Sequence, residues 1–568
     1  GILVDDAIVV VENIHRHMSL GGKSLREALP AAVDEIGGPT ILATFTVIAA
    51  LLPMAFVSGL MGPYMRPIPI NASVGMLLSL LIALTVTPWL AVKLLSRHYA
   101  RTAQDGHAHG GAAGRLHRIF DRLMRPLLHP TRGGRRRGLL FAIIGAAVML
   151  SIGLTVVQWV VLKMLPFDNK SELQVVVDMP EGSPLERTNA LLVELAEVVR
   201  QRPEVADVQG YAGISAPVNF NGLVRQYYLR QGANLGDLQV NLVDKHARSS
   251  KSHEIARQLR PALQAVAERY GAALKVAEVP PGPPVLAPLL AEVYGPDAAT
   301  VRQIARDLEK LARQTEGLVD IDTSLEASAQ RETLVVDRIR AARLGVSQQA
   351  IAQTIAAAVG GYDATYLRNA AAKKAIPVRL RLPAADQARI EELLALKVRA
   401  QDGRLIPLVE LVEVRRDAWE PVLMQKDLLP VVYVMADEAG ALDSPLYGMF
   451  SLVAQVDQLE ARVPLEQRFF SAPADPLAFT IKWDGEWQIT WQTFRDMGIA
   501  YAAGMVLIYL LIVAQFRSYV VPLIIMAPIP LTVIGVMPGH ALLGAQFTAT
   551  SMIGMIALAG IIVRNSIL

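Results

Sequence analysis

Apolar runs long enough to cross a membrane flank one long polar stretch in this chain. A membrane-spanning helix needs about 20 apolar residues to cross a hydrocarbon core about 30 Å thick. After a first apolar run at the N-terminus, runs of about that length predict helices at 39–57, 71–95, 138–161, 498–516, 519–538 and 547–568. Because both ends of the sequence fall inside apolar runs, we expect it to be a fragment of a longer chain.

The polar stretch at 162–497 has the pattern of short strands and amphipathic helices. Ser183, with Glu186 three residues later, predicts a capping box at the start of a helix. A proline-rich run at 280–284 predicts a rigid linker. Three strand–helix–strand units are expected, with elements at 173–178, 183–202, 205–211, 238–242, 252–270, 274–279, 289–294, 298–315 and 319–322. The predicted fold class is a membrane α-helical bundle plus an α+β domain of repeated split-βαβ (ferredoxin-like) modules.

Basic residues predict how these helices are oriented. Between Lys93 and Arg137 there are eleven Lys or Arg residues and two acidic ones. Such segments stay on the cytoplasmic side of a membrane. Counting spans from this segment places the polar stretch outside, and the first and last apolar runs then cross in the same direction.

Composition narrows the class of protein. Of 568 residues, 52% are hydrophobic and 19% are charged, so membrane spans must be combined with a large water-exposed part. The net charge of +3 and the single basic cluster argue against a nucleic-acid-binding surface. With no cysteine, disulfides and thiolate metal sites are excluded.

An internal repeat singles out three charged residues. The sequence Gly-Ile-Leu-Val-Asp-Asp-Ala-Ile at 1–8 aligns with Gly-Ile-Ile-Val-Arg-Asn-Ser-Ile at 560–567. Parallel repeats of this kind are typical of transporters, whose sites lie between the two halves. Asp6 precedes Arg16 by ten residues, about 15 Å of helix, which places it near the middle of a bilayer. Arg564 lies at the matching place of the second repeat.

Placing a charged side chain at that depth costs at least about 2.5 kcal/mol, so such a residue is expected either to pair with an opposite charge or to serve the function of the protein. Burial favours a protonated Asp5 or Asp6, whereas a guanidinium nearby favours the carboxylate. We therefore expect proton binding and release to break and remake a contact between these aspartates and Arg564; a static ion pair is the alternative. Further hydroxyl and amide groups that could extend a proton path are Thr548, Thr550, Ser551 and Asn565, although Ser and Thr in membrane helices usually bond backbone carbonyls.

The N-terminal run Gly-Ile-Leu-Val-Asp-Asp-Ala-Ile-Val-Val-Val-Glu-Asn at 1–13 resembles the fourth transmembrane helix of resistance-nodulation-cell division (RND) efflux pumps, the AcrB-like hydrophobe/amphiphile branch. The resemblance extends along the chain. Further matching segments are Leu-Pro-Met-Ala-Phe at 52–56, the stretch from Leu-Pro at 165–166 to Glu-Arg-Thr at 186–188, Ala-Ala-Val-Gly-Gly at 357–361, and the stretch from Ala-Gln-Phe-Arg-Ser at 514–518 to Pro-Leu at 530–531.

The resemblance implies a homotrimeric pump of the bacterial inner membrane that exchanges amphiphilic compounds for protons, with no cofactor beyond the proton-motive force. It implies two partners, a periplasmic adaptor protein and an outer-membrane channel. Arg564 stands where many AcrB-like pumps carry lysine; because arginine stays protonated, the aspartates must carry the proton. The implied parts are family helices 4–6 at 1–96, a cytoplasmic basic segment at 97–137, helix 7 at 138–161 and a porter subdomain at 162–282. A second porter subdomain follows in two parts, at 283–336 and 418–497, with a docking (funnel-like) subdomain between them at 337–417, and helices 8–10 lie at 498–568.

A loop between drug pockets in the family corresponds by position to the segment 210–222, with Tyr211, Pro217 and Phe220 as candidate substrate contacts. A plain surface loop fits the sequence as well, since mobile loops commonly join such modules.

Three other functions are considered. A heavy-metal efflux pump would use methionines as soft ligands, but those of the polar stretch are scattered, at Met164, Met179, Met424, Met435, Met449 and Met497, and we expect no metal site. An intramembrane aspartyl protease needs two carboxylates that converge on one water, whereas Asp5 and Asp6 lie about 100° apart around one helix. A scaffold without transport activity would have little use for three charges inside the membrane.

Overall fold

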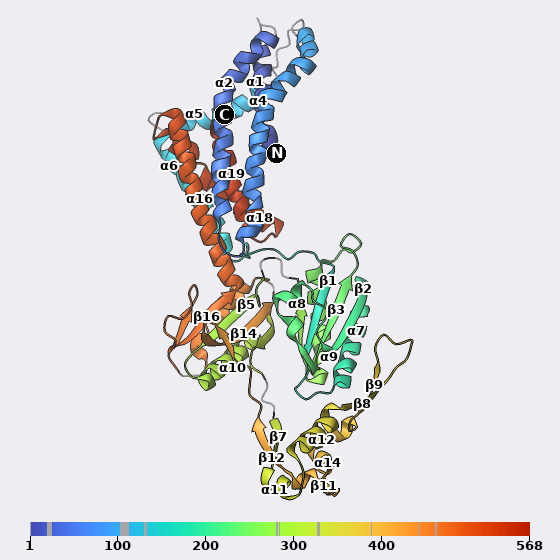
Figure 1. Cartoon of the computed structure of the whole chain (residues 1–568). Coiled ribbons are helices and arrows are strands. Elements are labelled where there is room, and N and C mark those ends of the chain that lie inside the picture. The colour runs from blue at the N-terminus through green and yellow to red at the C-terminus, as the bar shows by residue number, and fades with distance from the viewer. Residues whose placement is uncertain are drawn as a thin grey trace. The chain divides into compact units, whose positions relative to one another are not determined.

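The structure is a computed structural model that describes residues 2–19, 25–102, 113–129, 133–279, 282, 284–326, 330–387, 389–440, 442–460 and 463–567. Gly1, part of the basic segment at 97–137, and three prolines of the run at 280–284 lie outside the described residues. The chain divides into two compact units, of which the first comprises Gly1–Ser324 with Met424–Leu568 and the second Leu325–Leu423. Figure 1 shows the elements of both.

Six helical segments of the described chain are long and apolar enough to cross a membrane. They overlap the six predicted spans, although the first two begin earlier than predicted, at Leu25 and Gly62. They are Leu25–Phe56, Gly62–Leu94, Gly133–Val156, Glu486–Phe516, Val521–Leu543 and Ala549–Ile567. The first apolar run forms a further helix, α1, at Ile2–Ser19. The chain is therefore a multi-pass membrane protein with sheet-containing parts.

The helix α2, at Leu25–Leu51, lies at the centre of the helical bundle. It packs against α1, α4 (Pro67–Thr102), α16 (Glu486–Phe516) and α19 (Ala549–Ile567). Glycines permit the two closest approaches: a Cβ on Gly560 of α19 would lie 3.1 Å from Val47 Cα, and one on Gly504 of α16 would lie 3.1 Å from Ala49 O. Small residues at helix interfaces are the usual way in which membrane helices approach closely.

Two spans differ from their predicted form. The span predicted at 138–161 ends as helix α6 (Gly133–Val156), because the following segment leaves the helix and Lys163 N donates to Phe547 O at 3.1 Å. The span predicted at 519–538 is broken into α17 (Val521–Met526), the 3₁₀ turn η5 (Ile529–Thr532) and α18 (Val533–Leu543). Pro528 and Pro530 explain the break, because proline lacks the amide hydrogen that an α-helix requires.

The first sheet of the polar stretch has four strands in the order β2-β3-β1-β4, and every neighbouring pair is antiparallel. Two helices pack on one face of it and close a core of leucine, valine and isoleucine side chains. The elements are β1 (Glu172–Asp178), α7 (Leu185–Arg200), β2 (Val205–Ile214), α8 (Phe220–Val224), η2 (Tyr227–Leu229), β3 (Gln231–Leu242), α9 (Ser252–Tyr270) and β4 (Ala273–Ala277). The capping box predicted at Ser183 and Glu186 is wrong: Pro184 is the N-cap of α7 and makes no side-chain cap.

The second sheet has six strands, in the order β13-β14-β5-β16-β15 with β6 also on β14. All pairs are antiparallel except β15 with β16. Gly485, at φ +77°, joins β16 to the membrane helix α16, and a Cβ there would lie 2.5 Å from Pro288 O. The elements are β5 (Leu289–Tyr294), α10 (Ala298–Gln314), β6 (Leu318–Thr323), β13 (Met424–Lys426), β14 (Leu429–Glu438), α15 (Pro445–Val453), η4 (Val456–Gln458), β15 (Leu465–Arg468) and β16 (Phe479–Gly485).

The second unit is built from three two-stranded ribbons and short helices around a small apolar core. Its ribbons pair β7 (Gln330–Val336) with β12 (Val412–Ala418), β8 (Tyr362–Leu367) with β9 (Ile376–Leu380), and β10 (Lys397–Arg399) with β11 (Leu405–Pro407). The helices are α11 (Arg338–Arg343), α12 (Gln348–Gly360), α13 (Ala384–Gln387), α14 (Ile390–Leu394) and the turn η3 (Leu408–Glu410).

Candidate functional site

Arg564 and Asp6 meet in the interior of the helical bundle. Arg564 Nη2 donates to Asp6 Oδ1 at 2.7 Å, and both residues have no solvent-exposed surface. Arg564 Nη1 also lies 3.7 Å from Asp5 Oδ2, although the Asp5 side chain is 43% exposed. The structure therefore brings together the three charged residues that the internal repeat singled out, with Asp6 as the close partner and Asp5 as the outer one.

Helix geometry explains why the two aspartates differ. Adjacent residues on a helix point about 100° apart, so only one of them can face the interior of the bundle. The first helix packs on α2 and α4, and α19 packs on α2. Gly560 lies one turn before Arg564 on α19, where it permits close contact with Val47 of α2.

A threonine on α2 completes the site, and the sequence interpretation missed it. The Thr44 hydroxyl lies 3.4 Å from Asp6 Oδ1 and 3.5 Å from Oδ2, and it donates to Thr40 O at 3.0 Å. Both threonines have no exposed surface. Their spacing of four residues, which places both on one face of a helix, is the signal that could have identified them.

The predicted relay hydroxyls lie elsewhere. The Thr548 hydroxyl is 2.7 Å from that of Thr550 and 3.4 Å from that of Ser551, and His540 Nε2 lies 2.9 Å from Ser551 Oγ. Sixteen residues separate Thr548 from Arg564, about 24 Å of helix. The structure therefore does not bring these hydroxyls to the carboxylates. Asn565 is exposed.

The segment at 210–222 is less of a loop than expected. Strand β2 continues to Ile214, and Phe220 begins helix α8, so the loop prediction is wrong at both ends. Tyr211 donates to Gln209 Oε1 at 3.0 Å, while Pro217 and Phe220 are exposed. Between these ends, the Ala216 amide donates to Asp237 and Asn219 Nδ2 donates to Gln174 and Gln239, so hydrogen bonds tie the segment to the first sheet.

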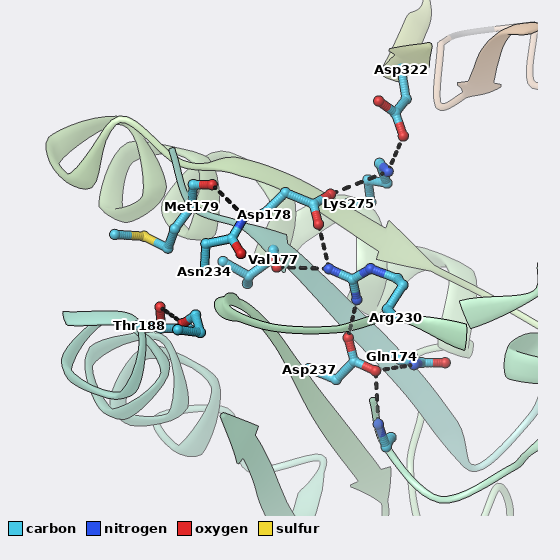
Figure 2. Close-up of polar contacts among 12 residues, drawn as sticks. Gln174, Val177, Asp178, Met179, Thr188, Arg230, Asn234, Asp237, Lys275 and Asp322 are labelled. Atoms are coloured by element: carbon cyan, nitrogen blue, oxygen red, sulfur yellow. Dashed lines mark hydrogen bonds and ion pairs between the residues drawn. The ribbon is translucent and has the colours of Figure 1, made fainter. Parts of the chain in front are cut away.

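Those hydrogen bonds belong to a charged cluster on the first sheet, shown in Figure 2. Asp237, with no exposed surface, accepts from the Ala216 amide at 2.8 Å and from Gln174 Nε2 at 3.1 Å. Arg230 donates to Asp237, to Asp178 and to Val177 O. Burial opposes ionisation of Asp178, but the charges of Lys275 and Arg230 outweigh it and hold the pKa of Asp178 below its usual value.

Three ion pairs connect the first sheet, its helix α9 and its loops to the second sheet. They are Arg225 with Asp437, at 2.9 Å, Arg260 with Asp320, and Lys275 with Asp322. Burial raises the pKa of Asp320 to about 6 despite its cationic partner. A cavity of about 200 Å³ lies beside these pairs, and Tyr227, Tyr433, Met424 and Met435 also line it. It has room for a small molecule that offers both apolar and charged groups.

In the described part of the chain, no group of three or more His, Cys, Asp or Glu side chains is arranged to hold a metal ion. Most of the methionines considered as possible metal ligands are core residues: Met164, Met179, Met449 and Met497 are buried. Met424 and Met435 are the two that share a cavity.

Comparison with known proteins gives consistent results over the whole chain. The model of the AcrB/AcrD/AcrF family matches residues 1–568. The multidrug resistance protein MdtC of Serratia proteamaculans (strain 568) is 24% identical over 573 residues, covering 100% of this chain and 51% of that protein. The swarming motility protein SwrC of Bacillus subtilis (strain 168) is 23% identical over 578 residues, covering 100% of this chain and 50% of that protein.

Solved structures show the same fold. A crystal structure of a heavy metal efflux pump superposes with a TM-score of 0.76 at 20% identity, covering 100% of this chain and 52% of that one. The chain thus spans about half the length of the relatives that it matches.

Proposed function

Because the chain belongs to the AcrB/AcrD/AcrF family of RND efflux transporters, we propose that it exports amphiphilic or hydrophobic compounds in exchange for protons bound at Asp5 and Asp6. The observation that supports this most is the contact of 2.7 Å between Arg564 and Asp6 inside the membrane helices. A buried ion pair adds little net stability, whereas ionisable groups within a membrane commonly serve transport.

The proton in this scheme is carried by an aspartate. Arginine remains charged in proteins, so Arg564 acts as a fixed counter-charge. When Asp6 takes up a proton, its ion pair with Arg564 is lost and its new hydroxyl needs an acceptor. Thr44 supplies one, because its own proton is donated to Thr40 O at 3.0 Å. The attraction between α1 and α19 then weakens, which allows the two helices to separate.

The substrate would pass through the sheet-containing parts, which we propose lie in the periplasm and are built of repeated split-βαβ modules. The element order β1-α7-β2-β3-α9-β4 supports this interpretation for the first sheet. The cavity of about 200 Å³ suits amphiphilic compounds, because Tyr227 and Tyr433 offer apolar surface beside the charges of Arg225 and Lys275.

Assembly is also a proposal. We propose a homotrimer in the bacterial inner membrane that works with a periplasmic adaptor protein and an outer-membrane channel. Family membership supports this, and the ribbon of β8 and β9 offers apolar side chains for contacts: Tyr362, Tyr366, Leu367, Ile376, Val378 and Leu380 are exposed.

Heavy-metal export is the second candidate, because Met424 and Met435 line one cavity and thioethers bind soft metal ions. Growth of a pump-deficient strain that carries the full-length protein separates the two. Tolerance of dyes with unchanged sensitivity to copper and zinc supports amphiphile export, and the reverse pattern supports metal export.

The direct test is efflux of several dyes from whole cells by the full-length protein. Asp6→Asn should abolish efflux while the protein remains in the membrane, and a protonophore should do the same to the wild type. Glu12→Gln, an exposed acid on the same helix, is the matched control and should retain efflux. Efflux by Asp6→Asn at the wild-type rate would overturn the proposal.

A further inference from the structure

A group of buried charges lies where the membrane helices join the two sheets. Lys163, in the segment after α6, is 2% exposed, and its ammonium group lies 3.3 Å from Asp443 Oδ2 and 3.8 Å from the centre of the Phe167 ring. His253 of α9 lies 2.8 Å from Glu278 and 3.3 Å from Asp443 Oδ1. These contacts give both Asp443 and Glu278 a cationic partner.

Two acids at the same place have no such partner. Glu438, at the end of β14, and Glu486, the first residue of α16, are 8% and 6% exposed. Neither forms an ion pair among the described residues, and Glu438 Oε2 accepts no hydrogen bond there. A buried carboxylate that has no counter-charge in direct contact favours its protonated form.

A small cavity connects these acids. Glu438 and Glu486 line a space of about 20 Å³, together with Lys163 and Asp443. One water molecule needs about 10–15 Å³ and two to four polar partners, and both conditions hold here. The remaining charged groups that line the cavity are paired: Asp437 with Arg225, Glu278 with His253, and Arg260 with Asp320.

We propose that Glu438 and Glu486, with a water molecule between them, form a proton-binding site outside the bilayer core. The proton resides mainly on Glu438, because the N-terminal end of a helix favours a negative charge and Glu486 occupies that end of α16. Burial raises the pKa of Glu438 to about 7, and the charge of Asp443 acts in the same direction. Together they outweigh the backbone hydrogen bonds from Ser444 and Gly448 and the charge of Lys163, which favour the carboxylate.

The site of Glu438 and Glu486 lies at the start of helix α16, which extends to the part of the bundle that holds Asp6 and Arg564. Glu486 begins α16, and the joint before it is rigid because Gly485 packs against Pro288. Eighteen residues later, about 27 Å along the helix, Gly504 packs against Ala49 and Ala50 of α2, the helix that carries Thr44. Loss of the proton puts a second negative charge beside Glu486 and destabilises this end of α16. The inference rests on the proposed proton-driven function, whose pump it would regulate.

Infrared difference spectroscopy of the full-length protein in lipid nanodiscs tests the site directly. The protein is titrated from about pH 5 to about pH 9. This range covers the titration of a carboxyl group whose pKa is raised above its usual value. The wild type should show a carboxyl signal that titrates near 7 and that is missing in Glu438→Gln. Glu181→Gln, an exposed acid, and Asp6→Asn should both retain it.

A transport measurement tests whether the site of Glu438 and Glu486 regulates the pump. In proteoliposomes at constant proton gradient, the pH dependence of wild-type dye efflux should have a component near neutral pH that Glu438→Gln lacks. If Glu438→Gln folds poorly, Glu438→Asp should move the infrared signal instead of removing it. An infrared signal unchanged in these variants, or the absence of any carboxyl titration near 7 in the wild type, would overturn the proposal. Failure of the proposed function shows separately, as efflux by Asp6→Asn.

Discussion

Arg564 Nη2 and Asp6 Oδ1 lie 2.7 Å apart, on helices that come from opposite ends of the sequence. Neither residue has exposed surface, so each charge is compensated mainly by the other. Asp5 contributes a second, weaker contact, at 3.7 Å from Arg564 Nη1. This asymmetry predicts that the two partners of the pair are not equally costly to remove.

Arg564→Met should destabilise the folded protein by about 3–5 kcal/mol near neutral pH, because it leaves Asp6 buried without a counter-charge. Asp6→Asn should cost less, since Asp5 still faces Arg564. Chemical unfolding of the purified protein in detergent measures both losses. Asn565→Ala, at an exposed neighbour, serves as control and should change stability by less than about 0.5 kcal/mol. Equal losses for the two variants would contradict the role of Asp5.

Thr44→Val should slow efflux about fivefold and change its pH dependence, because the valine cannot accept the proton of a neutral Asp6 and one hydrogen bond is worth about 1 kcal/mol. Thr44→Ser should restore both. Thr46→Val on the same helix is the matched control, since the Thr46 hydroxyl donates only to Ala43 O at 2.7 Å. Dye efflux measured across a pH series distinguishes these outcomes, and an identical effect of Thr46→Val would reject the role of Thr44.

Much of the architecture could be predicted from the sequence, because the spacing of apolar residues and the length of apolar runs indicate directly which residues are buried. The helix expected at 252–270 and the strand expected at 289–294 have those bounds in the structure. Tertiary contacts set the rest: α6 ends at Val156 because the next segment pairs with residues near Phe547, which are distant in sequence.

The site was predictable only as far as its charges stood out from their surroundings. Asp6 and Arg564 are conspicuous in apolar runs, and the internal repeat paired them. Thr44 was missed because threonine in a membrane helix ordinarily bonds a backbone carbonyl, as it does here with Thr40 O. The position of its oxygen beside Asp6 depends on how α1 and α2 pack, which a single sequence does not reveal.

Gly560→Val should destabilise the protein by about 1–3 kcal/mol and reduce efflux, because the added side chain overpacks the contact between α19 and α2. A Cβ at this position would already lie 3.1 Å from Val47 Cα and 3.2 Å from Ala50 Cβ. Gly554→Val, on the same helix, meets nothing within 4 Å and should be tolerated. Thermal unfolding and dye efflux measure both variants, and equal effects would show that close helix contact at Gly560 is unimportant.

His253 should make stability depend on pH above neutrality. Burial alone would lower its pKa, but hydrogen bonds and charges from Asp443 and Glu278 outweigh burial and raise it to about 9. A raised histidine pKa means that the folded state binds the proton more tightly than the unfolded state, whose pKa stays near 6.5. The stabilisation, on the order of 3 kcal/mol, is therefore complete below about pH 6.5 and is lost as the pH rises through about 9. Unfolding measured at pH 6 and pH 9 should show this loss in the wild type and in the exposed control His246→Gln. His253→Gln should already be less stable at pH 6 and should show a clearly smaller loss, which comes from other groups such as Glu438. A wild-type loss that persists undiminished in His253→Gln would assign the effect to another group.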